Sequence, residues 1–280
     1  MKGYKLIFTD LDGTLLYPDS SSVTPENLRA IEELYKRGVQ VIPCSGRPYK
    51  LIPEILRENP YIRYISTSNG AVIVDKQSSE PVVDNRLCAE HRRVLVEVLK
   101  KYDIFPAFHM RGVDHCDESF FTADCYERYG LDRFFAEYFE KNAVRVKGLM
   151  EMAASDPTLA MTCSFIADRE QREMLLSELR DTGIFRTAQS HPNNVEAFSI
   201  KAGKGNALRA LAERLGVDIS ETVAVGDSNN DATMIEAAGL GLAVENALQS
   251  LKDIADEVIC PHKDHVLDYI LKHYIFVNFG

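Results

Sequence analysis

The stretch KLIFTDLDGT, residues 5–14, places a short apolar run directly before two aspartates. A run of this length, ended by polar residues, is typical of a buried strand. Asp10 and Asp12 then stand two positions apart, where the strand gives way to a loop. Ligands of open α/β sheets bind at the carboxyl ends of the strands. The stretch therefore predicts an α/β fold with a ligand site that begins at Asp10.

Strands and amphipathic helices alternate on both sides of a long middle segment. The first helix shows the pattern, because Thr24 is a good N-cap, Pro25 suits the first helical position and Gly38 is a typical stop. Strands are expected over residues 5–9, 39–44, 64–68, 222–225 and 241–244, and helices over residues 25–37, 49–57, 204–215, 232–238, 248–255 and 265–273. Strands connected by helices form parallel βαβ units. We therefore predict a doubly wound, Rossmann-like parallel sheet.

The middle of the chain mixes short strands with helices in a different order. Strands are expected over residues 105–110, 119–122, 159–167 and 184–187, and helices over residues 89–102, 126–141 and 169–180. At 280 residues the chain is also near the length at which a second core forms. We therefore predict a discontinuous core domain of residues 1–84 and 190–280, interrupted by an α+β domain of residues 85–189.

The composition limits the partners of this chain. A formal net charge of −10 argues against nucleic acid and anionic membranes, because proteins that bind phosphate backbones carry basic stripes. No apolar run has the length of a signal peptide or a membrane span. The six cysteines form no C-x-x-C pair, which fits reduced thiols in a cytoplasm. We expect a cytoplasmic protein without nucleic-acid or membrane partners, and its oligomeric state is unknown from sequence.

Carboxylates gather at two predicted strand ends. Asp10 and Asp12 follow the first strand, and Asp227 and Asp231 lie in the segment GDSNND, residues 226–231. Either cluster alone fits ordinary helix caps and Asx-turns. Together at one edge of a sheet, the carboxylates would repel one another without a cation, and oxygen ligands without histidine suit a hard ion such as Mg²⁺. We therefore expect a magnesium site.

A carboxylate such as Asp10 that attacks a phosphate ester meets like-charge repulsion. At about 3 Å and an effective dielectric constant of about 20, the repulsion is on the order of 5 kcal/mol for each charge pair. A bridging Mg²⁺ and a lysine offset it, and Lys204 opens a predicted helix whose dipole also favours anions. Ser45 offers a hydroxyl and nearby N–H groups to the phosphoryl oxygens. Asp12 can protonate the leaving oxygen and then activate water.

The sequence resembles the haloacid dehalogenase-like (HAD) superfamily, subclass IIB, the Cof-type phosphatases. Four motifs of that family stand in order: DLDGT at residues 10–14, CSGR at 44–47, Lys204-Gly205 at a helix start and GDSNND at 226–231. The turn SNGA at residues 68–71 also matches the subclass. The resemblance spans nearly the whole chain. It implies a HAD core, with the insertion between the second and third motifs as a cap domain that sets specificity.

The resemblance also implies a role for each matching residue. Asp10 is the expected nucleophile, which forms an aspartyl-phosphate, and Asp12 is the expected general acid and base. Mg²⁺ would be held by Asp10, by the backbone carbonyl of Asp12 and by Asp227, with Asp231 supporting the metal or the lysine. The residues expected at the phosphoryl group or the substrate are Ser45, Gly46, Arg47, Asn69, Lys204 and Asn230. For Arg47 and Asn69, a role in turns or surface pairing is an equal alternative.

The expected function is Mg²⁺-dependent hydrolysis of a small phosphorylated metabolite, with a sugar phosphate as the favoured substrate. Two alternatives remain open. A phosphomutase shares the fold and the aspartyl-phosphate step, and a phospho-accepting regulatory module also uses acidic residues, a lysine and Mg²⁺. The cap and Asp12 argue against the regulatory module, which needs neither a lid nor a leaving-group acid. Lys201 is a minor rival of Lys204, because the segment before Lys204 lacks the proline usual in the family.

Overall fold

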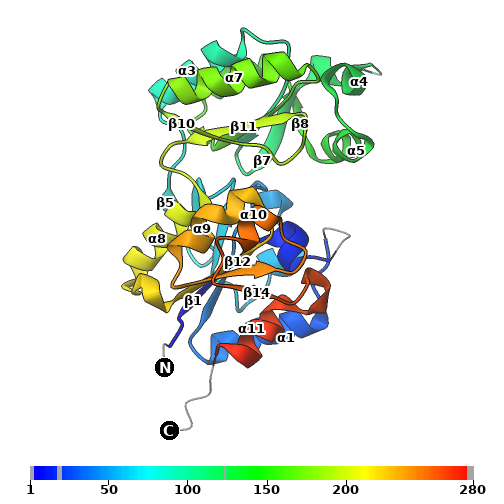
Figure 1. Ribbon diagram of the computed structural model, residues 1–280. Helices are drawn as coiled ribbons and strands as arrows, with labels where there is room; N and C mark the ends of the chain where they lie inside the picture. Colours follow the sequence, from blue (N-terminus) through cyan, green and yellow to red (C-terminus); the bar gives the residue numbers. More distant parts are fainter. Residues whose placement is uncertain (1–2, 18–20, 123, 276–280) are drawn as a thin grey trace. The chain divides into compact units, whose positions relative to one another are not determined.

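The computed structural model describes residues 3–17, 21–122 and 124–275 of the chain. Two compact units are drawn in Figure 1, with colours that follow the sequence. The first unit is made of the segments Met1–Arg47, Ile52–Asp84 and Gly203–Gly280, and the second of Pro48–Leu51 and Asn85–Ala202. Within the described residues, no helix has the length and apolar character needed to cross a membrane.

The first unit is built on a parallel sheet with the strand order β14-β13-β12-β1-β2. The strands are β1 (Leu6–Thr9), β2 (Gln40–Pro43), β12 (Thr222–Gly226), β13 (Leu240–Val244) and β14 (Glu257–Ile259). β1 pairs with both β12 and β2, and Thr9 lies opposite Val225 on one side and Pro43 on the other. The loops that follow these three strands therefore leave the sheet side by side at one edge.

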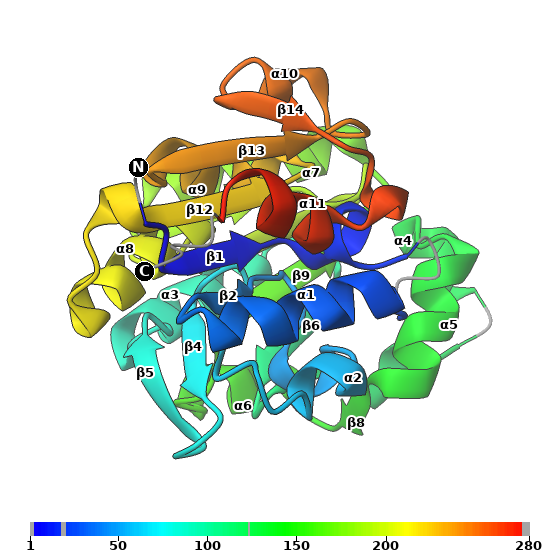
Figure 2. The ribbon, with the colours of Figure 1, turned by 90° about the horizontal axis from the view of Figure 1, so that it is seen from below.

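Helices cover both faces of this sheet, as Figures 1 and 2 show. One face carries α1 (Pro25–Lys36) and α11 (Val266–His273), and the other α8 (Lys204–Leu215) and α9 (Ala232–Ala237); α10 (Gln249–Lys252) precedes β14. The hydroxyl of Thr24 accepts from the N–H of Asn27 and caps α1 as expected. Tyr35, near the end of this helix, is exposed and packs against the ring of Tyr61. The doubly wound fold predicted from the sequence is confirmed.

The strand predicted over residues 64–68 does not extend the parallel sheet. β3 (Tyr64–Thr67) pairs antiparallel with β4 (Val72–Asp75), which pairs with β5 (Glu80–Asp84) in a separate sheet. A single parallel bridge between Cys44 and Ser66 connects β3 to the end of β2. The helix predicted over residues 49–57 is also interrupted. Pro53 separates a 3₁₀ turn from the short helix α2 (Glu54–Arg57), because proline suits a helix start and not its interior.

The second unit has a mostly antiparallel sheet with the order β10-β11-β9-β6-β7-β8. Its strands are β6 (Phe105–Met110), β7 (Val113–Asp117), β8 (Val144–Val146), β9 (Met161–Phe165), β10 (Phe185–Ala188) and β11 (Asn194–Ser199), and its helices are α3 (Ala89–Leu99), α4 (Cys125–Tyr129), α5 (Arg133–Asn142), α6 (Leu149–Ser155) and α7 (Arg169–Asp181). Figure 1 shows α3 and α7 along one face of this sheet. On the other face Phe105, Phe139 and Phe165 form a cluster of tilted and edge-to-face rings that packs with α4 and α5.

Three predictions for this region were wrong. The strand expected over residues 119–122 is a 3₁₀ turn, and the strand itself is β7. The helix expected over residues 126–141 is divided where Gly130 adopts a left-handed conformation. The predicted end of the insertion at residue 189 also comes too early. The second unit continues to Ala202, because β11 pairs with β9 and β10.

Candidate active site

Three loops converge at the carboxyl edge of the first unit's sheet. Asp10 follows β1, Ser45 follows β2 and Asp227 follows β12. The backbone N–H of Asp10 donates to the carbonyl of Val225 at 2.9 Å, which extends the pairing of β1 and β12 up to the site. Because all three loops leave neighbouring parallel strands, residues far apart in the sequence meet here.

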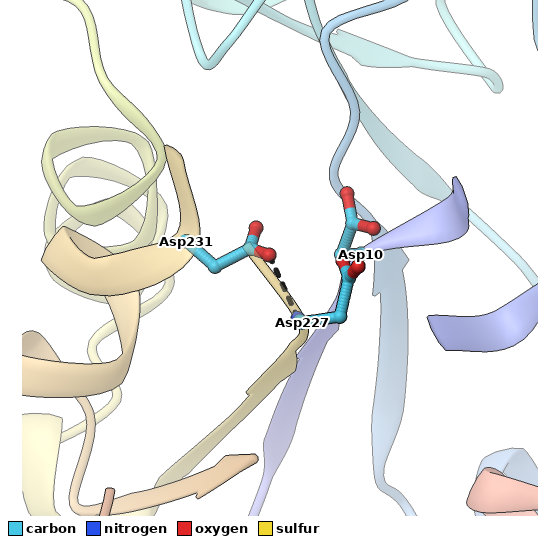
Figure 3. A group of neighbouring side chains, drawn as sticks. All are labelled: Asp10, Asp227 and Asp231. Atoms are coloured by element: carbon cyan, nitrogen blue, oxygen red, sulfur yellow. Dashed lines mark hydrogen bonds between the residues drawn. The ribbon is translucent and has the colours of Figure 1, made fainter. Parts of the chain in front are cut away.

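Three carboxylates face one another at this edge (Figure 3). Asp10, Asp227 and Asp231 each offer an oxygen, and these oxygens all lie within 4.8 Å of one another. Burial raises the pKa of Asp10 well above its usual range, and the negative charges of Asp231 and Asp227 add to the rise, while Lys204 opposes it. Burial and the charge of Asp231 likewise raise the pKa of Asp227 to about 6. The protein therefore gathers more negative charge than its own groups neutralise.

Lys204 is the cation of this cluster. Its side chain is fully buried at the start of α8, and its Nζ donates to Asp10 Oδ1 and Asp231 Oδ1, both at 2.5 Å. Burial alone would lower the pKa of Lys204, but the carboxylates of Asp10 and Asp231 outweigh burial and raise it. Its rival Lys201 is exposed and belongs to the second unit. The structure thus brings Lys204 to the predicted nucleophile.

Asp231 organises the loop that presents Asp227. Its Oδ2 accepts from the N–H groups of Asp227 and Ser228, both at 3.0 Å, and its Oδ1 accepts from Lys204. Gly226 lies against this carboxylate, where an added Cβ would stand 2.5 Å from atoms of the Asp231 side chain. Asp231 therefore makes its hydrogen bonds to other groups of the protein. This fits its expected role, which is to support the metal or the lysine.

The donor set fits a divalent cation. Asp227 Oδ1 is buried and has no hydrogen-bond partner among the described residues. A buried carboxylate oxygen without a partner is costly, and a bound cation would satisfy it. Oxygen ligands alone suit Mg²⁺ better than softer metals. Gly13, with φ of +80°, passes so close that an added Cβ would lie 2.6 Å from Asp227 Oδ2, so the two loops enclose the site tightly.

Asp12 is not a member of this carboxylate cluster. It lies in the turn over Leu11–Leu15, where Asp12 and Gly13 have non-helical backbone angles, and its half-exposed side chain accepts two parallel hydrogen bonds from Arg47. Arg47 Nε donates to Oδ2 at 2.9 Å, and Nη2 donates to Oδ1 at 2.5 Å. The expected metal ligand at this position is the backbone carbonyl of Asp12, which leaves the side chain available for another task.

Ser45 and Asn69 belong to one backbone network. The N–H of Asn69 donates to the carbonyl of Ser45, and the N–H of Ser68 donates to the carbonyl of Arg47, both at 3.0 Å. Ser68 and Asn69 hold left-handed φ angles of 50° and 53°, which cost free energy in residues other than glycine. The side chain of Asn69 is buried and accepts from Asn230 Nδ2 at 3.2 Å. Asn69 thus connects the Ser45 loop with the loop after β12.

Gly46 lies beside this network and was expected to contact the substrate. An added Cβ at Gly46 would stand 3.3 Å from Asn69 Oδ1, which is tighter than an ordinary contact. A glycine at this position therefore lets the Ser45 loop pack closely against Asn69.

A family model described as haloacid dehalogenase-like hydrolase matches residues 7–271. The chain belongs to the haloacid dehalogenase-like hydrolases. Phosphatase YwpJ of Bacillus subtilis is 28% identical over 96% of this chain and 99% of its own. The 5-amino-6-(5-phospho-D-ribitylamino)uracil phosphatase YcsE of the same organism is 26% identical over 97% of this chain and 96% of its own. A solved HAD subclass IIB sugar phosphatase, 20% identical, superposes with a TM-score of 0.78 over 96% of this chain and 98% of its own.

These comparisons confirm the predicted family, fold class and enzyme class, a HAD-type phosphatase of the Cof type. The structure of this hydrolase also contains site residues that the sequence analysis missed. Asn246, in the loop after β13, donates to the carbonyl of Gly13 at 2.8 Å, and the N–H of Leu248 donates to the carbonyl of Asp227 at 2.8 Å. The sequence could have indicated Asn246, because this residue follows the end of a fourth parallel strand.

One buried nucleophile near the site of this HAD-like hydrolase is inert. Cys44 lies at the end of β2, and burial raises the pKa of its thiol to about 12. A thiol that stays protonated at neutral pH is a poor nucleophile. Cys44 is therefore not a candidate nucleophile of this site at neutral pH.

Proposed function

We propose that this protein is a Mg²⁺-dependent phosphatase that hydrolyses a small phosphorylated metabolite through an aspartyl-phosphate at Asp10. The observation that carries the proposal is the buried set of Asp10, Lys204 and Asp231 beside Asp227, whose Oδ1 lacks a partner. Bound Mg²⁺, held by Asp10, the Asp12 carbonyl and Asp227, would polarise the phosphoryl group and offset its charge. The side chains of the protein carry out the remaining chemistry.

In the first step a carboxylate oxygen of Asp10 forms a bond to phosphorus, and the bond between phosphorus and the ester oxygen breaks. Lys204, which holds Asp10 Oδ1, fixes the direction of attack, and the hydroxyl of Ser45 binds a phosphoryl oxygen. Asp12 gives its proton to the departing oxygen. In the second step Asp12 takes a proton from water, which attacks phosphorus and releases phosphate from Asp10.

We further propose that the substrate carries its phosphate on a sugar or sugar alcohol. This choice is supported by the relative named for a ribitylamino compound with a terminal phosphate. The second unit, which interrupts the core between Ser45 and Lys204, is the proposed cap and would select the ester. The net charge of −10 and the free cysteines support a cytoplasmic location without nucleic-acid or membrane partners.

The purified protein should release phosphate from a panel of esters only when Mg²⁺ is present. The panel would include sugar and sugar-alcohol phosphates, nucleoside monophosphates, a phosphopeptide and p-nitrophenyl phosphate, each with Mg²⁺, with EDTA and with Ca²⁺. We expect the highest kcat/KM for a sugar or sugar-alcohol phosphate. In the presence of EDTA we expect no activity with any ester. Ca²⁺ should inhibit, since its looser coordination allows bidentate carboxylate binding that spoils the geometry of attack.

Two variants sharpen this experiment. Asp227→Asn should raise the Mg²⁺ concentration for half-maximal activity by more than about tenfold. Loss of a group that only hydrogen-bonds to a metal ligand already lowers metal affinity by about that factor. Asp253→Asn, at an exposed aspartate after α10, is the matched control and should behave as wild type. Replacement of residues 85–202 by a short Gly/Ser linker should retain some hydrolysis of p-nitrophenyl phosphate and abolish discrimination among natural esters.

Full activity after exhaustive chelation would refute the metal assignment. Slow loss of phosphate from acetyl phosphate without turnover of any ester would instead favour the phospho-accepting regulatory module. Transfer of the phosphoryl group to a second hydroxyl of the sugar, at the expense of free phosphate, would favour the phosphomutase. A shortened protein that folds and keeps the parent's ranking of esters would show that the second unit does not select the substrate.

A further inference from the structure

The geometry of the ion pair between Arg47 and Asp12 indicates the role of Arg47. One edge of the guanidinium, made of Nε and Nη2, faces both oxygens of the carboxylate, at 2.9 and 2.5 Å. The Arg47 side chain is 23% exposed and the Asp12 side chain 46%. Two parallel hydrogen bonds of this kind add directional restraint that a single ion pair lacks.

The backbone of Arg47 is itself held in place. Its N–H donates to Ser45 Oγ at 3.1 Å, and its carbonyl accepts from the N–H of Ser68 at 3.0 Å. The guanidinium therefore extends from a loop that is tied at both sides. An aspartate in the turn over residues 11–15 otherwise has several side-chain rotamers available to it, and the fork from Arg47 selects one of them.

We propose that Arg47 is a positioning residue, which fixes the orientation of the Asp12 carboxylate, and that it is not a phosphate ligand. The proposal rests on the proposed function, in which Asp12 gives a proton to the leaving oxygen. One of the two guanidinium edges with which Arg47 could grip a phosphate in two-pronged fashion, the edge made of Nε and Nη2, is already used on Asp12. A carboxylate has about four lone-pair positions, of which Arg47 takes two. The others remain free to carry the proton to the ester oxygen as the bond to phosphorus breaks.

This assignment predicts a dependence on the leaving group. An alkyl ester needs a proton on its departing oxygen, whereas p-nitrophenolate leaves without one. The constant kcat/KM reports only the steps up to formation of the phosphoenzyme. Loss of Asp12 orientation should therefore lower kcat/KM for the alkyl ester far more than for p-nitrophenyl phosphate. A lost phosphate ligand would instead lower both values alike and raise KM for both esters.

The test compares Arg47→Ala and Arg47→Lys with wild type on the best alkyl ester of the panel and on p-nitrophenyl phosphate. We expect kcat/KM for the alkyl ester to fall about 10- to 100-fold, part of the range that general acid catalysis supplies. The ratio of kcat/KM for p-nitrophenyl phosphate to that for the alkyl ester should rise by about the same factor, because p-nitrophenolate leaves without a proton. Arg47→Lys should share this change because it keeps the charge but loses the fork.

Arg63→Ala is the matched control. Arg63 forks onto the carboxylate of Asp75 in the first unit, with Nε to Oδ1 at 3.1 Å and Nη2 to Oδ2 at 2.8 Å. Its loss removes a similar ion pair and should leave the ratio unchanged. On an Asp12→Asn background, Arg47→Ala should cause no further change in the burst of nitrophenolate released from p-nitrophenyl phosphate, because Arg47 acts through Asp12.

An equal loss for both esters, or a further loss on the Asp12→Asn background, would overturn the positioning role. Circular dichroism of each variant excludes unfolding as the cause. The wild-type rates separate this proposal from the proposed function. If the wild-type protein hydrolyses no ester, the proposed function fails. If it hydrolyses both and the ratio is unchanged in Arg47→Ala, only the positioning role fails.

Discussion

Asp10→Asn should abolish turnover and leave the fold intact. An amide is a poor nucleophile, and loss of a covalent nucleophile in other hydrolases costs more than about 10⁴-fold in kcat. Asn has nearly the same shape as Asp, and Lys204 keeps its ion pair with Asp231, so the buried cluster loses no cation. Steady-state rates and circular dichroism at the same pH measure the two effects.

Two further aspartates serve as comparisons for Asp10→Asn. Asp12→Asn should also stop turnover, but it should still permit capture of the phosphoryl group from p-nitrophenyl phosphate, seen as a burst of nitrophenolate. Asp75→Asn removes the charge of a buried aspartate of the first unit that is paired with Arg63, and it should keep the activity. More than about one hundredth of the wild-type rate in Asp10→Asn would be incompatible with covalent catalysis by Asp10.

Lys204→Met should destabilise the protein strongly and also silence it. The Lys204 side chain is completely buried, and its removal leaves Asp10 and Asp231 without their cation. Breaking a buried ion pair by removing one partner costs about 3–5 kcal/mol in the free energy of unfolding. Urea denaturation in EDTA at pH 8 measures this change without a contribution from bound metal.

Lys272→Met is the control for Lys204→Met. Lys272 pairs with Asp268 one turn away on α11, but its side chain is 65% exposed. Exposed pairs of this kind contribute less than about 1 kcal/mol. Equal free energies of unfolding for Lys204→Met and wild type would show that Lys204 does not hold the cluster together.

Local sequence signals were sufficient for the parts of the site that depend on strand ends. Asp10 and Asp227 each follow a short apolar run, and parallel strands bring such ends to one edge. Lys204 opens α8, at the residue where the sequence predicts the start of this helix. The positions of these strands and of this helix follow from apolar periodicity and from helix caps, and both can be read from a single sequence.

Features that depend on long-range pairing were not visible. The run at Tyr64–Thr67 is compatible with parallel or antiparallel pairing, and only the turn through Ser68 and Asn69 returns the chain to β4. No strand was predicted over residues 194–199, where β11 pairs with its neighbour β10 and with the distant β9, so the predicted boundary fell before β11. The fork between Arg47 and Asp12 joins two loops 35 residues apart. No spacing rule predicts such a contact.

The stereochemical course at phosphorus tests the central claim, attack by Asp10 itself, most directly. The best ester of the panel would be prepared as a phosphorothioate whose two non-bridging oxygens are different isotopes, and hydrolysed in water of the third oxygen isotope. Each in-line displacement inverts the configuration at phosphorus. Two displacements, first by Asp10 and then by water, predict net retention in the released thiophosphate. Net inversion would mean that water attacks the ester directly, and it would contradict an aspartyl-phosphate intermediate.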